Sequence, residues 1–132
     1  MALQLLVVTP ERKVVEAEAD EVELPGAEGY LGILPGHTPL ITLLKTGVLT
    51  FKRAGRSQAF AVSAGFAEIA NDKVNVLADS AEGTGEIDVA AAERARSAAE
   101  EEMKTAGVDT LPEIRARFEL ADARIHAARR PA

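Results

Sequence analysis

Cysteine and tryptophan are absent from this sequence of 132 residues, and aromatic residues make up only 4% of it. Without cysteine, the chain has neither disulfide bridges nor thiolate metal sites. With so few aromatic residues, its core must be built from aliphatic side chains. No apolar run approaches the ~20 residues of a membrane-spanning helix, and the first residues lack the basic and apolar segments of a signal peptide. We therefore expect no direct membrane insertion.

Basic residues are outnumbered by acidic ones, 15 against 21, and the formal net charge at pH 7 is -6. A general nucleic-acid binder needs a basic face that displaces counterions from phosphates, so this balance argues against a nucleic-acid partner. The end of the chain is different, because residues 110–132 carry five arginines against three acidic residues. This segment has the opposite sign of charge from the rest of the chain.

Motifs typical of enzymes are missing as well. The two histidines, His37 and His126, lie in different halves of the chain. The sequence has no Walker motif, no nucleophile elbow and no cluster of metal ligands. Because His37 stands alone in a Gly-Pro turn, we interpret it as a structural hydrogen-bonding residue or an interface residue. The sequence therefore predicts a protein that is not an enzyme.

Residues 1–85 are predicted to form a domain made of strands. Turn signals such as Thr9-Pro10, Pro25-Gly26 and Asn71-Asp72 separate short apolar or alternating runs. This spacing is typical of an all-β sandwich or barrel. The runs cover residues 3–8, 20–24, 48–53, 58–63, 66–69 and 74–77.

Residues 86–132 change to a helical period and are predicted to form an antiparallel helical hairpin. Asp88 is placed as the N-cap of a first helix and Gly107 as its C-cap, and Thr110 to Glu113 form a capping box with Pro112 in the first turn. The apolar face of the first helix contains Val89, Ala92, Ala95, Ala99, Met103 and Ala106, and that of the second contains Ile114, Phe118, Ala121, Ile125 and Ala128.

The alanine-rich faces of this hairpin bury little apolar area, because burial is worth only about 25 cal/mol per Å². A helical element that is weakly held can change its position on the protein. The alternative is a small helical cap that is permanently packed on the strand domain.

The run from Gly29 to Leu40 combines three glycines and two prolines with apolar residues. Glycine permits positive φ and proline fixes φ, so this run specifies one backbone path. We expect either a well-defined turn between two strands or a surface that contacts another molecule.

Over nearly its full length, the chain resembles the epsilon subunit of bacterial and chloroplast F-type ATP synthases. The resemblance implies an N-terminal β-sandwich and a C-terminal helical hairpin, which agrees with the two periods described above. Its most specific element is Pro-Gly-His-x-Pro-Leu. The blocks that carry the resemblance are Val8-Thr9-Pro10, Gly32 to Leu40, Ser63 to Glu68, Lys73 to Ala78, and Ile87-Asp88.

The resemblance implies a non-catalytic subunit of the central stalk that couples the gamma subunit to the ring of c subunits. It also implies that the protein lies peripherally at the cytoplasmic face of the bacterial plasma membrane. The implied contact residues for gamma and the c-ring are Glu28, Gly29, Tyr30, Pro35, Gly36 and His37. Tyr30 replaces the small or acidic residue expected at this position.

In this family the hairpin is the regulatory element, and when it extends into the catalytic alpha and beta subunits it inhibits ATP hydrolysis. The implied contacts with the catalytic subunits are Arg115, Arg117, Arg124 and Arg129, because arginine pairs bidentately with carboxylates. The alternatives are a solvated basic face, or pairing with the acidic residues at positions 100–102 of the neighbouring helix.

Some members of the family bind ATP through an Ile/Leu-Asp-x-x-Arg-Ala motif. Here Ile87 and Asp88 are kept, but Ala91 replaces the arginine. Arg94 lies about one turn further along and would serve only a shifted nucleotide. We therefore expect no resident cofactor and interpret Asp88 first as a helix cap. The alternative for the whole protein is a free-standing interaction module without a role in a motor.

Overall fold

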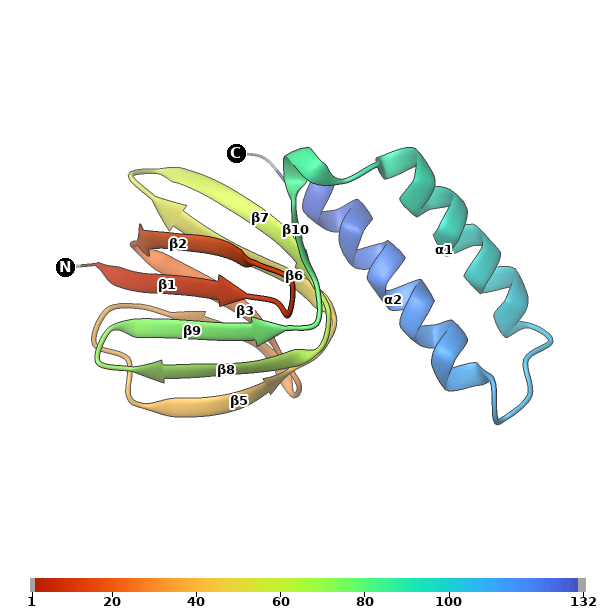
Figure 1. Ribbon diagram of the computed structural model, residues 1–132, viewed down its shortest axis with the longest axis horizontal. Helices are drawn as coiled ribbons and strands as arrows, with labels where there is room; N and C mark the ends of the chain where they lie inside the picture. The colour runs from red at the N-terminus through yellow and green to blue at the C-terminus, as the bar shows by residue number, and fades with distance from the viewer. Residues whose placement is uncertain (1, 131–132) are drawn as a thin grey trace.

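Ten strands, one short 3-10 helix and two α-helices make up the described residues, 2–130, of a computed structural model (Figure 1). The strands are β1 (Leu3–Val8), β2 (Lys13–Ala19), β3 (Glu21–Gly26), β4 (Gly29–Ile33), β5 (Leu40–Leu44), β6 (Gly47–Arg53), β7 (Arg56–Val62), β8 (Gly65–Ala70), β9 (Lys73–Ala78) and β10 (Ala81–Gly83). The helices are η1 (Thr84–Glu86), α1 (Val89–Met103) and α2 (Leu111–Ala128).

The strands form a β-sandwich, as the sequence predicted. They pair in the order β10-β7-β6-β3-β5-β8-β9-β1-β2, and β4 pairs with β3 outside this path. Alternation along the strands places aliphatic side chains inward: Leu3, Leu5 and Val7 of β1 are all almost fully buried. The core between the two layers is therefore aliphatic, with one stacked aromatic pair, Phe51 and Phe60.

The hairpin turn between β8 and β9 follows local turn chemistry. Asn71 and Asp72 both have positive φ, the conformation that a two-residue type I′ turn requires and that asparagine and aspartate tolerate best. A second two-residue turn, at Ala54-Gly55, joins β6 and β7, and both of its residues also have positive φ.

The two helices lie beside the sandwich as an antiparallel hairpin, which confirms the second part of the predicted fold (Figure 1). Helix α2 packs against both α1 and the sheet at β6 and β7. Asp88 caps α1 as predicted, because its side chain accepts a hydrogen bond from the backbone N–H of Ala91 at 3.0 Å.

Several local predictions about the hairpin were wrong. Helix α1 ends at Met103 with Lys104 as its C-cap, so Gly107 lies in the connection and does not cap the helix. Thr110 makes no side-chain cap, because its hydroxyl donates to the Gly107 carbonyl at 3.3 Å instead. Ala95, expected on the buried face, is exposed, since Ala92 and Ala99 alone are buried in α1.

The run from Gly29 to Leu40 is not a single turn. Residues 29–33 form β4, which pairs with β3, and Leu40 begins β5, so only residues 34–39 connect two strands. Leu31 and Ile33 are the inward residues of β4, and this short alternation was hidden by the surrounding glycines. Strands β2 and β5 were not predicted either: β2 alternates acidic residues with alanine, and β5 is a short apolar run directly after the Gly-Pro-rich segment.

Candidate interaction surfaces

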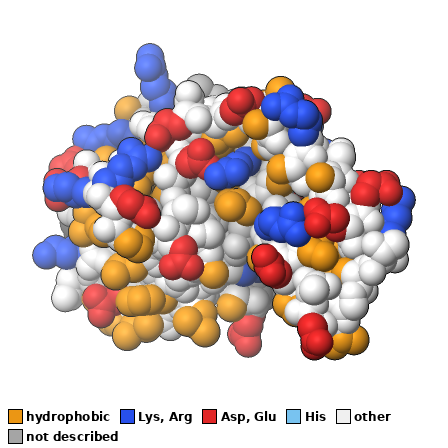
Figure 2. Space-filling view, turned by 45° about the vertical axis from the view of Figure 1, so that its right-hand side comes forward, with side chains coloured by type: hydrophobic (Ala, Val, Ile, Leu, Met, Phe, Trp, Pro, Cys, Tyr) orange, Lys and Arg blue, Asp and Glu red, His pale blue; other side chains and the backbone are white. Residues whose placement is uncertain are grey.

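An uncovered row of large apolar side chains crosses three neighbouring strands. Ile41 and Leu43 of β5 are 71% and 69% exposed, while Phe66 of β8 and Leu77 of β9 are 43% and 44% exposed. Leu43 stands opposite Phe66, and Phe66 opposite Leu77, so three of the four side chains lie side by side. We call these four residues the apolar face. In Figure 2, hydrophobic side chains gather along the lower left margin, at the height of β5 in Figure 1.

Strand β5 is also nearly unpaired along one edge. It pairs with β8 along its whole length on one side, but with β3 only at Gly26 and Leu44 on the other. A hollow of about 540 Å³ lies between β5 and the β3–β4 connection. An exposed apolar edge strand invites association with other chains, so such edges are normally covered in the working protein. The apolar face and the free edge of β5 therefore form a candidate interface.

The first group of predicted contact residues lies at the tip between β3 and β4. Glu28 is exposed at this tip, and Gly29 opens β4 opposite Gly26. Tyr30 points back toward the body of the protein, where its hydroxyl accepts a hydrogen bond from the N–H of Val48 at 3.0 Å. The ammonium group of Lys45 lies 6.0 Å from the centre of its ring.

The second group, Pro35, Gly36 and His37, lies in the connection between β4 and β5. The N–H of Gly36 donates to the carboxylate of Asp72 at 2.7 Å, and Gly36 has a φ of 87°, which favours glycine. Nδ1 of His37 lies 2.6 Å from the carbonyl oxygen of Thr38, so its side chain makes a local contact with the neighbouring residue.

The structure does not bring these two groups together. The five residues of β4, which span roughly 13 Å at strand geometry, separate the tip from the second group. The tip lies beside Pro25 and Lys45, whereas the second group lies beside the β8–β9 turn. They are therefore two separate candidate contacts rather than one.

Three of the four hairpin arginines form ion pairs within the chain. Arg117 makes a two-pronged pair with Glu102 of α1 at 3.0 and 3.1 Å, and Arg129 reaches Glu93 of α1 at 3.3 Å. Arg124 pairs at 2.5 Å with Glu82, which belongs to the sandwich. The fourth, Arg115, is exposed. The alternative of pairing with residues 100–102 thus holds for Arg117 but not for Arg124 or Arg129.

The hydrogen bonds between Arg117 and Glu102 also shift both protonation equilibria. They hold the pKa of Glu102 below its ordinary value and raise the pKa of Arg117, with direct charge attraction adding to both shifts.

Helix α2 rests on a seat of small side chains on the sandwich. Ala123 and Ala127 of α2 pack with Val48 of β6 and with Ala59 and Ala61 of β7, and we call these three sandwich residues the seat. This second buried stripe of α2 was not predicted, because Ala123 and Ala127 lie outside the apolar face that the helical period defines. The hydroxyl of Thr84 donates to the carbonyl oxygen of Ala127 at 3.0 Å.

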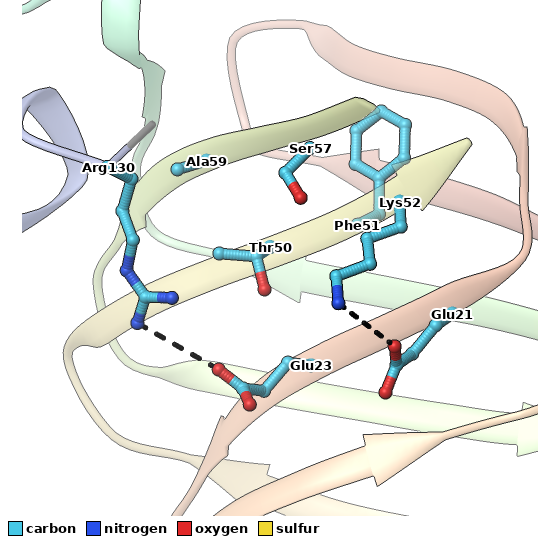
Figure 3. A pocket seen from close by; sticks show the side chains of 8 residues that line it. All are labelled: Glu21, Glu23, Thr50, Phe51, Lys52, Ser57, Ala59 and Arg130. Carbon is cyan, nitrogen blue, oxygen red and sulfur yellow. Dashed lines mark ion pairs between the residues drawn. The ribbon is translucent and has the colours of Figure 1, made fainter. Parts of the chain in front are cut away.

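A polar pocket continues along the sheet beyond the end of α2 (Figure 3). There Arg130, which follows α2, reaches toward Glu23 of β3 at 3.9 Å, and Lys52 reaches toward Glu21 at 3.7 Å. The opposite charges in this pocket already face one another, and the pair of Arg130 and Glu23 adds a weak ion pair between the hairpin segment and the sandwich.

The residues of the degenerate ATP motif have structural partners. Ile87 packs against the seat, and Asp88 is engaged as the cap of α1. Arg94 is exposed on α1. Across residues 2–130, no group of three or more side chains is arranged to hold a metal ion. Within the same range, neither helix is long and apolar enough to cross a membrane.

Comparisons with known proteins agree on one family. The family model described as "ATP synthase, Delta/Epsilon chain, beta-sandwich domain" matches residues 2–84. The chain is 42% identical to the ATP synthase epsilon chain of Myxococcus xanthus, covering 93% of this chain and 87% of that protein. It is 43% identical to that of Anaeromyxobacter sp. (strain Fw109-5), covering 98% and 100%.

A similar fold occurs in a cryo-EM structure of the Euglena gracilis mitochondrial ATP synthase containing OSCP, F1 and the c-ring. The TM-score is 0.84 at 19% identity, with 96% of this chain and 81% of that chain covered.

Proposed function

Because the chain belongs to the ATP synthase epsilon chain family, we infer that it is a non-catalytic subunit of the central stalk of ATP synthase. In this role it couples the gamma subunit to the c-ring. The Euglena assembly, which contains F1 and the c-ring, supports these partners. Such a subunit attaches to the membrane peripherally, through the complex, and in a bacterium it lies on the cytoplasmic side.

The apolar face is the surface we assign to the stalk partner, the gamma subunit. The observation that carries this assignment is the uncovered edge of β5, with Ile41 and Leu43 about 70% exposed. A rotor contact must stay closed under load, and burying large aliphatic and aromatic side chains provides the stabilisation for such a contact. The turn at Pro35 to His37 leads into the start of β5, and the tip at Glu28 and Gly29 lies near its other end, so both are candidate contacts with gamma or the c-ring.

Leu43→Glu tests this interface. Since Leu43 is already exposed, the variant should keep its thermal stability but lose most of its binding to the gamma subunit. Gln58→Glu, at a site on β7 that is also exposed, is the control and should bind normally. Co-purification with the membrane-bound enzyme gives the readout. If Leu43→Glu assembles as well as the control, the apolar face is not the stalk contact.

The hairpin is the regulatory part in this proposal, and Arg115, Arg117, Arg124 and Arg129 are its contacts with the catalytic subunits. Three of these arginines are paired within the docked hairpin, so they become available only after those ion pairs break. Deleting residues 88–132 should leave assembly intact and raise ATP hydrolysis by the assembled enzyme. Loss of assembly would instead make the hairpin a structural element.

We also propose that the protein holds no resident cofactor. The capping bond of Asp88 supports this, since the carboxylate is engaged by the backbone of α1. Calorimetric titration with ATP checks the proposal directly.

A free-standing interaction module remains the alternative function, and it predicts a protein that does not co-purify with the membrane-bound enzyme.

A further inference from the structure

Tyr30 connects two parts of the molecule that are distant in the sequence. It stands in β4, one residue after the tip at Glu28 and Gly29. Its hydroxyl oxygen accepts the backbone N–H of Val48, at the start of β6. The side chain of Val48 is only 3% exposed and belongs to the seat on which Ala123 and Ala127 of α2 rest. One hydrogen bond therefore joins the tip to the seat of the helical hairpin.

The surroundings of Tyr30 fit this position closely. Gly47 precedes Val48, and a Cβ atom there would lie 2.8 Å from the hydroxyl oxygen of Tyr30 and 2.7 Å from Cβ of Pro25. Only glycine leaves room for the ring to reach the backbone of Val48. The ammonium group of Lys45 faces the ring from the β5–β6 connection. Gly47 therefore makes room for the hydrogen bond, whereas the ammonium group of Lys45 lies over the ring and takes no part in that bond.

Tyr30 also lines the cleft between the sandwich and α2. The cleft has a volume of about 370 Å³, with Tyr30 and residues 45–48 on the sandwich side. Phe118, Asp122 and His126 of α2 lie on the opposite side. A change in the position of Tyr30 therefore alters both the backbone of the seat and the sandwich wall that faces α2.

We propose that Tyr30 is a positioning residue that makes docking of α2 depend on the conformation of the β3–β4 tip. Its hydroxyl holds the start of β6 in the position that the alanines of α2 require. When the tip is displaced, the ring moves, the N–H of Val48 loses its acceptor and the seat loosens. The inference concerns the isolated chain and does not depend on the proposed function.

The first test is Tyr30→Phe, which keeps the ring and removes only the hydroxyl. We expect amide exchange at Val48 to become about fivefold faster, as expected for the loss of one neutral hydrogen bond. The undocked fraction of α2 should rise by a similar factor. Because the natural chain has no cysteine, spin labels at Gln58→Cys and Ala116→Cys, both exposed, report the distance between β7 and α2.

Two comparisons separate positioning from general stability. Lys45→Gln keeps the hydroxyl and should leave exchange at Val48 and the label distance unchanged. Exchange at Val76, in the sandwich core, should be unchanged in Tyr30→Phe. If exchange rises throughout the sandwich, or if the label distance stays at its natural value, Tyr30 does not position the seat and the proposal fails.

The second test addresses the tip. Gly29 has a φ of 137°, so Gly29→Ala strains the tip without placing an atom against any neighbour. In the natural background this variant should raise the undocked fraction of α2. In the Tyr30→Phe background it should have little further effect, because the connection is already broken. Equal effects in both backgrounds, or no effect in either, would overturn the dependence of docking on the tip.

Discussion

Helix α2 has two interfaces, and they are built very differently. Toward α1 it presents Ile114, Ala121 and Ile125, which are all buried. Toward the sandwich it presents Ala123 and Ala127, about 200° further round the helix at 100° per residue. The first interface buries two large branched side chains, whereas the second buries only methyl groups of α2.

The ion pairs show the same inequality. Three pairs join α2 or its C-cap to α1: Arg96 to Asp122 at 2.8 Å, Arg117 to Glu102, and Arg129 to Glu93. Two pairs join the α2 segment to the sandwich: Arg124 to Glu82, and the longer contact of Arg130 with Glu23. The hairpin is therefore expected to leave the sandwich as one body before its two helices separate. Single substitutions can break each of these interfaces separately.

The largest effect is expected from Ile125→Ala, at the interface between the helices. Ile125 is 1% exposed, and its truncation leaves a cavity that costs about 2–4 kcal/mol of hairpin stability. Helical circular dichroism should be lost at a lower temperature than the β-sheet signal. Ile125→Val removes a single methylene and should cost only about 1 kcal/mol. A single common transition, equally shifted in both variants, would show that the hairpin does not unfold separately.

Ala127→Leu should release the hairpin from the seat while leaving the two helices together. Ala127 is fully buried against the seat, and the larger side chain creates about 1–3 kcal/mol of overpacking. Spin labels at Gln58→Cys and Ala116→Cys should move apart, while labels at Ala98→Cys and Ala116→Cys keep their distance. Ala116→Leu makes the same chemical change at an exposed position and is the control. Because this position otherwise carries a label, the control is assayed by its helical content. Separation of the helices from one another would contradict the order proposed here.

Of the two interfaces of α2, only the one with α1 could be predicted from the sequence. The seam of Ile114, Ala121 and Ile125 follows the helical period, so it could be predicted from spacing alone. The stripe of Ala123 and Ala127 could not, because alanine is compatible with either a buried or an exposed position. Its burial depends on Val48, Ala59 and Ala61, which come from strands more than sixty residues earlier.

The candidate surfaces divide in the same way. The Gly-Pro-rich run was expected to be a single turn or a contact surface, but its division into β4, a connection and β5 depends on pairing with β3 and β8, which its own residues do not reveal. The apolar face was not predicted, since exposed and buried leucines look alike in a sequence. The partner of the Tyr30 hydroxyl is a backbone group, and no sequence pattern identifies it.

The pair of Arg124 and Glu82 is expected to have a smaller effect on docking. Both side chains are about one third exposed, so the pair should stabilise the docked hairpin by about 1 kcal/mol or less. A double-mutant cycle with Arg124→Gln and Glu82→Gln isolates this interaction, with the labels on β7 and α2 giving the docked fraction. The two effects should not add. Additive effects would mean that the pair does not hold the hairpin to the sandwich.

The smallest predicted effect is a pH dependence of the contact between the helices, through Glu102 and Arg117. The pKa of Glu102 is lowered in the folded hairpin, first by the hydrogen bonds from Arg117 and then by its charge. A carboxylate with a lowered pKa stabilises the fold at pH values above its ordinary pKa of 4.5. This contribution is lost as the pH falls through the lower pKa that the group has in the folded protein.

Removing the carboxylate therefore distinguishes this pair from all other acidic groups. Glu102→Gln should be slightly less stable than the natural chain at pH 7, and the two should converge below pH 4.5. The difference should shrink in high salt, because both side chains are about half exposed. It should appear in the melting of the helices but not in the docked fraction of α2, since both partners belong to the hairpin. A pH-dependent change in docking itself would instead place a titrating group at the seat, and the two interfaces of α2 would then not be independent.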